Sequence, residues 1–462
     1  MGKNRAFRLL LAGSSVSMLG SRVTTIAYPM LVLHLTGSPF AAGWIAFAAT
    51  APSVLFYIPA GALVDRCDPR RAMLFSEFGR GVAIATVVAA TLVFGRPSLY
   101  LLVVTAVAEG ILAVFSAVSE PRYVRSLVEP DQASSALARI EARAHVVVLA
   151  GRPLGGFLFG LMPVLPFLAD ALSFIVSVVA LASMKSRRAI GQAVMLRSGD
   201  LFLALFKAVG LRCRNWLVSI RYRRLAEGQF RSDIRDGLRW LRRDQFARLS
   251  VISSAGATLI FQALIIVFIA DAHTRRLPSV AIGMVLAASG VGGALGALAA
   301  SRFRARANWP WLQIQIWAWA ASFAILALSS GKSFTLMAIM MAVLGFTGAL
   351  GNIEIHTYFI RNVAESMLAR ASSMSQMMSL GAYAAGPALG GILIQECHIR
   401  RTIFVLFIMT MFLAVVPFLR ILRSMLARCL KRTDDAAADN PLPRRGPGSA
   451  VAGCGPAGAG PP

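Results

Sequence analysis

The sequence predicts an all-α membrane protein with twelve transmembrane helices arranged as two six-helix halves. The first observation behind this prediction is composition, since 57% of the 462 residues are hydrophobic, only 15% are charged and the mean hydropathy is +0.66. A soluble domain cannot hide that much apolar surface from water, whereas a chain embedded in a bilayer need not. The second is that the apolar residues form long runs separated by charged links, which is typical of a multi-pass membrane protein.

Each long apolar run predicts one membrane-spanning helix, because about 20 residues of helix cross the hydrocarbon layer. Strands are not expected, since the runs are apolar on every side and lack the alternation of a membrane barrel. The first run continues to about Leu33 without a small-residue cleavage site, so it is predicted to be an uncleaved span. The predicted spans are residues 9–33, 40–64, 72–94, 98–119, 137–160, 164–184, 247–270, 279–300, 311–329, 334–356, 373–395 and 402–425.

Basic residues in the links predict the orientation of the chain. The N-terminal tail and the links on its side hold 34 Lys and Arg residues, whereas the opposite links hold six. Because basic residues are retained on the cytoplasmic side, both termini and the central link are expected there, in a plasma or inner membrane. The net charge of +26 is therefore attributed to topology, and no nucleic-acid recognition motif accompanies it. The five scattered cysteines indicate neither a disulfide framework nor a metal site.

Four regions follow from this pattern: an N-terminal six-helix half (1–184), a basic cytoplasmic linker (185–245), a C-terminal six-helix half (246–425) and a disordered cytoplasmic tail (426–462). The linker mixes apolar and cationic residues, so it either lies flat on anionic headgroups or is a solvated linker with short helices. From Thr433 onward the chain is rich in Pro, Gly and Ala, a composition that favours disorder.

An internal repeat relates the two halves. Four short motifs recur in the same order after about 235 to 239 residues, and in a Gly/Ala-rich chain one such match could be chance but four are not easily so. Duplicated halves are typical of transporters that bind substrate between them near the middle of the membrane. The clearest matches are "GALVDR" at Gly61 with "GALAASR" at Gly296, "YVRSLVEP" at Tyr123 with "FIRNVAES" at Phe359, and "GRPLGG" at Gly151 with "GPALGG" at Gly386.

Over residues 7–425 the chain resembles the major facilitator superfamily. The stretch "GALVDRCDPRR" is similar to that superfamily's loop between helices 2 and 3, although Asp68 replaces the usual second glycine. The resemblance implies the major facilitator fold, no cofactor, and a conformational latch in which the carboxylate of Asp65 caps a neighbouring helix. In the alternative interpretation the arginines only fix topology. The matching positions are Gly61, Asp65, Arg66, Arg70 and Arg71.

Finer features resemble the drug-exporter branch that includes macrolide-efflux and enterobactin-exporter proteins. They are "YPMLVLHLTGSP" at the end of the first span, "DALSF" in the sixth and "IRDGLRWLRRD" before the seventh. Two positions depart from that branch. Ser21 stands where an acidic residue is often found, and Arg152 intervenes between the Gly and Pro of the fifth span.

Charges inside the spans are the best indicators of a functional site, since each is costly in lipid unless it is paired or faces a cavity. Arg22 and Glu109 both lie near the middle of their spans, so they are predicted to be a pair or contacts for substrate and protons. The alternative is a static ion pair that fixes two helices. Arg152 and Asp170 are a second predicted pair, with a packing role as the alternative.

Other charged and small residues are predicted to have structural or conformational roles. Glu77 and Arg80 are spaced as an i, i+3 pair and are expected to be structural. Arg139, Arg143 and their neighbours at the start of the fifth span form either an inner gate or a solvated cluster. Small residues and prolines in two corresponding spans are predicted to allow close helix packing or hinge motion: Gly151, Pro153, Gly155, Gly156, Gly386, Pro387, Gly390 and Gly391.

The function predicted from the sequence is export of small amphipathic compounds by alternating access, driven by proton antiport. No GxxxxGK[ST] motif is present, so ATP-driven transport by this chain is not expected. The expected partners are a small-molecule substrate, protons and the lipid bilayer, with the protein as a monomer. The alternatives are uptake or symport of a small solute, a non-transporting sensor or scaffold, and an enzyme acting on lipid-linked substrates. No recognisable set of catalytic residues supports the enzyme.

Overall fold

The computed structural model describes residues 5–64, 67–128, 133–184, 239, 244–303, 310–328, 334–363 and 365–438. The chain divides into two units, Met1–Ala414 and Val415–Pro462. The first unit contains the cavity and the helices described below, except the part of the last helix from Val415 onward, which belongs to the second unit. Most of the predicted linker, and the tail beyond Ala438, lie outside the described residues.

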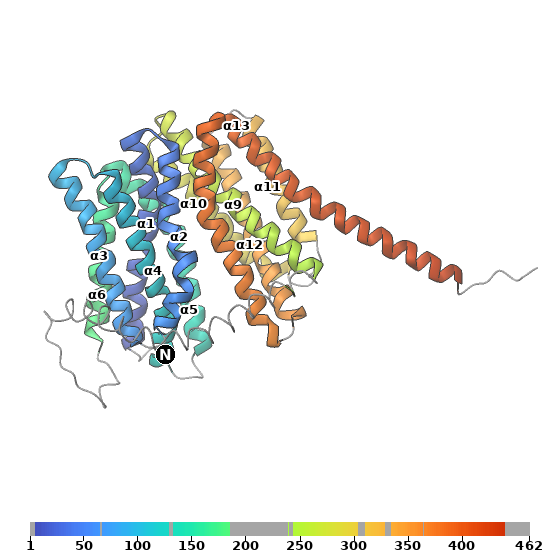
Figure 1. The fold of residues 1–462 in the computed structure, drawn as a ribbon, viewed down its shortest axis with the longest axis horizontal. Coiled ribbons are helices and arrows are strands. Elements are labelled where there is room, and N and C mark those ends of the chain that lie inside the picture. The colour runs from blue at the N-terminus through green and yellow to red at the C-terminus, as the bar shows by residue number, and fades with distance from the viewer. Residues whose placement is uncertain are drawn as a thin grey trace, which may run out of the picture. The chain divides into compact units, whose positions relative to one another are not determined.

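Helices account for every predicted span, which confirms the fold class. Figure 1 shows the first six helices gathered on one side and the later ones on the other. The N-terminal half contains α1 (Arg5–Thr36), α2 (Pro39–Val64), α3 (Pro69–Phe94), α4 (Leu99–Leu127), α5 (Ala133–Leu161) and α6 (Leu165–Ser183). The C-terminal half contains α9 (Gln245–Thr274), α10 (Ser279–Phe303), α11 (Pro310–Leu328), α12 (Phe334–Asn362) and α13 (Glu365–Ala438).

The last helix differs from the prediction in two ways. The spans predicted at 373–395 and 402–425 form one element, α13, which is interrupted only at His398, whose φ of 61° and ψ of 160° are not helical. A single residue therefore makes the turn between the two spans. The helix also continues to Ala438, so residues 426–438 are helical rather than part of the disordered tail expected from 426. Apolar length alone identifies nine spanning helices among the described residues.

Helix ends in the N-terminal half follow from short polar signals. Asp68 is the N-cap of α3, where its carboxylate accepts a hydrogen bond from the backbone N–H of Arg70 at 2.9 Å, and Pro69 is the first helical residue. Both choices suit a helix start, because a side-chain oxygen satisfies a free N–H and proline has none to lose. Capping of α3 thus explains why an aspartate can replace the usual glycine at position 68 of this loop.

The two halves touch on the side of the helix bundle opposite the N-terminus. Gly156, near the end of α5, faces the first turns of α10, and a Cβ there would lie 2.6 Å from the carbonyl oxygen of Ser279. Gly43, near the start of α2, similarly faces Gly391 of α13. Glycine at these positions lets the backbones of two helices touch. Gly151, Gly155, Gly386 and Gly390 are also in close contact with a neighbouring helix, while a hinge role for any of them stays a prediction.

Candidate functional site

A cavity of about 530 Å³ lies between the two halves. It is bordered by α1, α2, α3, α4 and α5 of the first half and by α9, α10 and α13 of the second. Along α1 it extends from Ser14 to Pro29, across the middle of that helix, and on α3 and α4 it reaches Met73 and Glu120, toward the helix ends on the side of the N-terminus. The closing contacts at Gly156 and Gly43 lie beyond its other end. This is the position in which a transporter with two halves binds its substrate.

The two halves line this cavity with different chemistry. The second half contributes apolar side chains, among them Ile265, Ile269 and Leu286, with Gln262 and Tyr383 as polar exceptions. All charged lining residues come from the first half: Arg22, Glu77, Arg80, Glu109, Glu120, Arg143 and Arg152. The cavity is therefore amphipathic, with one charged face and one apolar face.

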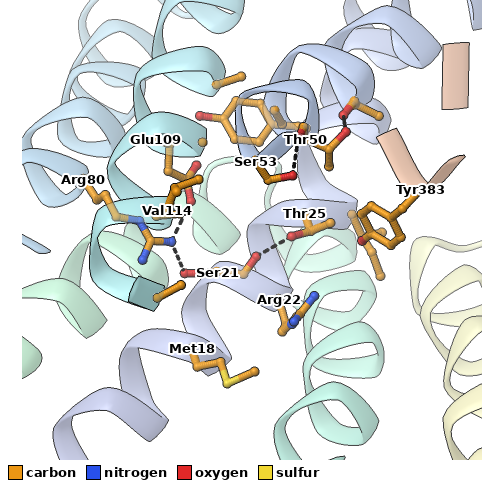
Figure 2. A pocket seen from close by; sticks show the side chains of 18 of the residues that line it. Met18, Ser21, Arg22, Thr25, Thr50, Ser53, Arg80, Glu109, Val114 and Tyr383 are labelled. Carbon is orange, nitrogen blue, oxygen red and sulfur yellow. Dashed lines mark hydrogen bonds and ion pairs between the residues drawn. The ribbon is translucent and has the colours of Figure 1, made fainter. Parts of the chain in front are cut away.

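A buried cluster of charges lies at the centre of the polar face. The guanidinium of Arg80 is 3.2 Å from the carboxylate of Glu109 and 3.6 Å from that of Glu77. The side chains of Arg80, Glu77 and Glu109 are only 8%, 4% and 12% exposed. Arg80 also donates a 2.6 Å hydrogen bond to the hydroxyl of Ser21, and its guanidinium lies 4.5 Å from the centre of the Phe174 ring. Figure 2 shows Arg80 between Glu109 and Ser21.

This cluster holds more negative than positive charge. Glu77 accepts hydrogen bonds from the hydroxyls of Ser17 and Ser116, which leaves Arg80 as its ion-pair partner. One guanidinium between two carboxylates leaves one negative charge without a counter-ion in the described part of the cluster. A proton on either carboxylate would remove that excess, which gives the site a chemical means to bind and release a proton.

Arg22 and Glu109 are not paired, which corrects the first predicted ion pair. Glu109 pairs with Arg80 instead. The reason is the direction in which each side chain leaves its helix. Successive residues of a helix are rotated by about 100°, so Ser21 faces Arg80 while Arg22 turns toward α5, where a Cβ on Gly151 would lie 2.5 Å from the Cβ of Arg22.

Arg152 and Asp170 are not paired with each other, which corrects the second predicted pair. Arg152 donates a 2.9 Å hydrogen bond to the hydroxyl of Ser289 on α10 and thereby links the two halves. Asp170 is fully buried within the first half, where it accepts hydrogen bonds from the hydroxyls of Thr24 and Ser173. It does not line the cavity. Similar depth along two spans therefore did not determine which neighbour each side chain faces.

The i, i+3 pair of Glu77 and Arg80 is present as predicted. The sequence analysis missed that the same arginine also binds Glu109 and that all three residues line the cavity. The signal was available in the sequence, since Arg80 lies inside a predicted span and a charge there requires a partner or a cavity.

A second ion pair lies at the end of the cavity near the N-terminus. Arg143 of α5 forms two hydrogen bonds with the carboxylate of Glu120 on α4, at 2.7 and 3.1 Å, and also donates to the hydroxyl of Ser14 on α1. Its side chain is 9% exposed. Three helices of the first half are therefore joined where the sequence predicted a gate or a solvated cluster, and the pair is buried rather than solvated. The side chains of Glu141 and His145 lie outside the part described.

The predicted latch lies only partly within the described residues. Asp65 and Arg66 lie outside them, so their role stays a prediction. Gly61 is in the last turn of α2, and no neighbouring atom lies within 4 Å of where its Cβ would be.

Arg70 has a contact that the sequence did not reveal. Its side chain donates hydrogen bonds to the carbonyl oxygens of Leu181 and Ala182, at 2.9 and 3.0 Å, in the last turn of α6. A cation is favourable there because the last carbonyl groups of a helix lack partners and carry partial negative charge. Arg71 is exposed and lies 4.0 Å from Asp68. The two neighbouring arginines therefore differ in what they stabilise.

Comparison with known proteins places this architecture among transporters. A family model described as the Major Facilitator Superfamily matches residues 10–309. The multidrug efflux pump Tap of Mycolicibacterium fortuitum is 33% identical over 87 residues, which are 19% of this chain and 21% of that protein. The chain thus matches about a fifth of the length of this curated relative.

Solved structures are similar over most of the chain. The nucleoside transporter NupG aligns with a TM-score of 0.63 and 14% identity, covering 90% of this chain and 98% of that one. A bacterial homolog of the human lysosomal transporter Spinster, inward-facing and unoccupied, aligns with a TM-score of 0.60 and 13% identity, covering 90% and 96%. A POT family transporter in complex with 5-aminolevulinic acid gives a TM-score of 0.60 and 12% identity, with the same coverage. At these identities the likeness concerns the fold.

Proposed function

The chain belongs to the Major Facilitator Superfamily, whose model covers residues 10–309, and from this premise we propose that it exports small amphipathic compounds in exchange for protons. Membership of this family makes the protein a membrane-embedded transporter rather than an enzyme. The direction of transport, the substrate class and the coupling to protons are the proposal. The observation that carries it is the cavity between the halves, with one charged face and one apolar face.

The cavity suits a small amphipathic molecule in both size and chemistry. Its volume of about 530 Å³ lies within the range of roughly 300 to 1,000 Å³ that small-molecule sites occupy. The apolar side chains of α9 and α10 would bury the hydrophobic part of the substrate, and the charged face would hold its polar group. The partial likeness to a multidrug efflux pump, over 19% of the chain, agrees with such a substrate.

The positions of the closing contacts support loading from the cytoplasm. The halves touch near Gly156 and Gly43, while the cavity extends toward the opposite helix ends, which include the N-terminus. The basic links predict that these latter ends face the cytoplasm. The arrangement therefore favours a state that collects substrate from the cytoplasm. Export then requires the contacts at α5–α10 and α2–α13 to open while the other end closes.

Glu109 is the residue that we assign to proton coupling. It shares Arg80 with Glu77, so a proton on Glu109 would leave Arg80 fully available to Glu77. Glu109 also lines the cavity, where a change in its charge is felt by a bound substrate. Protonation of Glu109 changes the charge of the polar face of the cavity in which the substrate binds, which provides a route for coupling the two.

The test compares wild type with Glu109→Gln in cells that lack their own exporters. A panel of cationic, neutral and anionic fluorescent amphiphiles is used, and export driven by an imposed pH gradient is measured in everted membrane vesicles. We expect Glu109→Gln to abolish export driven by the pH gradient but to retain exchange of substrate for substrate, because that exchange requires no proton. Glu396→Gln is the matched control, since Glu396 is exposed and lies outside the cavity.

Two results would contradict the proposal. If no compound accumulates differently in expressing and empty cells, export of such compounds is excluded. If expression raises rather than lowers accumulation, the protein is an uptake system. Equal activity of Glu109→Gln and wild type under a pH gradient would leave export intact but remove Glu109 from the coupling step.

A further inference from the structure

Two arginines in the cavity have no carboxylate partner among the described residues. Arg22 of α1 and Arg152 of α5 both line the cavity, yet the ion pairs of the described residues involve neither. The hydrogen bond of Arg152 goes to the neutral hydroxyl of Ser289. These two guanidinium groups are therefore the positive charges of the cavity that no described carboxylate neutralises.

The carboxylates of the cavity are occupied by other arginines. Arg80 lies between Glu77 and Glu109, and Arg143 binds both oxygens of Glu120. Asp170, which was expected to neutralise Arg152, is buried elsewhere against Thr24 and Ser173. The negative excess of the central cluster and the positive excess at Arg22 and Arg152 are thus held at separate places on the polar face.

The two arginines come from helices that touch at the same level. Gly151 packs against the Cβ of Arg22, and Arg152 is the next residue of α5. In Figure 2, Ser21 lies between Arg22 and the pair of Arg80 and Glu109, and Arg22 is on the side nearer Tyr383. Both arginines are half-buried and both border the space that also touches Ile265 and Leu286 of the second half.

Two neighbouring cations inside a membrane protein require compensation. A charged side chain at the centre of a bilayer costs free energy unless it is paired or solvated in a cavity, and two like charges also repel each other. Guanidinium groups bind carboxylate and phosphate oxygens through paired hydrogen bonds. An anion bound between the two would supply the missing counter-charge and use the donors that remain unbound.

We propose that Arg22 and Arg152 bind the anionic group of the transported molecule, so that the substrate class is an amphipathic organic anion bearing a carboxylate, sulfonate or phosphate. This inference rests on the proposed transport function and specifies its substrate. The apolar part of the molecule lies against the isoleucines of α9. Because Arg152 also reaches Ser289 of α10, the bound anion sits where the halves meet.

The test measures equilibrium binding, which is independent of the direction of transport. Purified full-length protein in nanodiscs of phosphatidylcholine, a lipid without net charge, is titrated with fluorescein and with rhodamine 123. The two dyes share a xanthene framework but carry opposite charge. Fluorescence anisotropy is recorded with empty nanodiscs as the blank. We expect saturable binding of fluorescein, and weaker binding of rhodamine 123.

The variants separate a charge site from general loss of structure. Arg22→Gln and Arg152→Gln are each expected to weaken fluorescein binding by about tenfold or more, as is usual when a charge-assisted hydrogen bond is lost. Arg22→Lys retains the charge and is expected to keep most of the affinity. Arg96→Gln is the matched control, because Arg96 is exposed in the link between α3 and α4. Among the described residues Arg22 makes no hydrogen bond or ion pair, so Arg22→Gln removes no contact of the described fold and also guards against misfolding.

Three results would overturn the inference: wild type shows no saturable fluorescein binding, wild type binds rhodamine 123 at least as tightly as fluorescein, or Arg22→Gln binds fluorescein like wild type. Failure here is distinct from failure of export. An exporter of cations would pass the accumulation assay and fail this one, whereas an importer of anions would do the reverse.

Discussion

At the scale of single residues, the central cluster contains two carboxylates but one arginine to pair with them. Arg80 is the only cation within ion-pair distance of Glu77 and Glu109 among the described residues. Removing one partner of a buried ion pair is far more damaging than replacing the whole pair, because it leaves an uncompensated charge away from water. Arg80 is therefore both a structural residue and the group through which the two carboxylates influence each other.

Substitution of Arg80 is predicted to destabilise the protein. Arg80→Gln leaves two buried carboxylates without a cation, and loss of one partner of a buried pair costs about 3 to 5 kcal/mol in general. We expect a lower midpoint of thermal unfolding in detergent, and partial recovery in the variant that combines Arg80→Gln with Glu77→Gln. The same midpoint for Arg80→Gln and wild type would show that the carboxylates are already neutral.

At the scale of elements, the segment Asp68–Arg70, where the loop after α2 enters α3, stabilises two helix ends at once. Asp68 caps the start of α3, and Arg70 binds the last carbonyl groups of α6. Both contacts are formed by residues of a segment that also resembles the family's conformational latch. This segment therefore fixes the start of α3 against the end of α6 within the first half, whatever contribution Asp65 makes.

Replacement of Arg70 and of Arg71 by glutamine is predicted to have different effects on α6. Arg70→Gln removes two hydrogen bonds to α6, so amide hydrogens in the last turn of α6 are expected to exchange faster with solvent. Arg71→Gln removes only an exposed pair at 4.0 Å, and such surface pairs contribute about 0 to 1 kcal/mol. Hydrogen–deuterium exchange of the two variants checks this, and equal protection of α6 in both would contradict the assigned role of Arg70.

At the scale of the whole molecule, the charge of the substrate determines how the membrane potential acts on transport. If an anion leaves the cytoplasm while a proton enters, both movements carry positive charge inward. An inside-negative potential favours each of them by about 2.3 kcal/mol per charge for every 100 mV. Export of an anion is thus aided by the potential, whereas its uptake would have to work against it.

Transport of fluorescein is accordingly predicted to be electrogenic. In proteoliposomes, a potential that is negative in the compartment facing the predicted cytoplasmic ends is expected to accelerate release of fluorescein from that compartment. Valinomycin with a potassium gradient sets the potential, and vesicles without valinomycin are the control. A rate that is the same at zero and at about 100 mV would exclude net charge movement in the exchange.

The site shows where prediction from sequence stopped. A charge in the middle of an apolar run singled out Arg22, Glu109, Arg152 and Asp170. The first three line the cavity, whereas Asp170 is buried against Thr24 and Ser173. Their partners were wrong, since depth fixes the position along a helix but not the direction around it. Ser21 and Arg22 differ by one residue, and yet one faces Arg80 and the other faces α5.

The sequence by itself determined the twelve spans, the two halves and the family, because apolar length, link charge and internal repetition are properties that can be measured along one dimension. Only the tertiary structure decided that Arg80 pairs with both Glu77 and Glu109, that Asp170 is buried away from Arg152, and that Arg22 lines the cavity without a carboxylate partner among the described residues. The physical reason is that the rotation and packing of each helix are set by contacts between segments far apart in the chain. Which charges remain without a partner, and so which substrate the cavity suits, depends on those contacts.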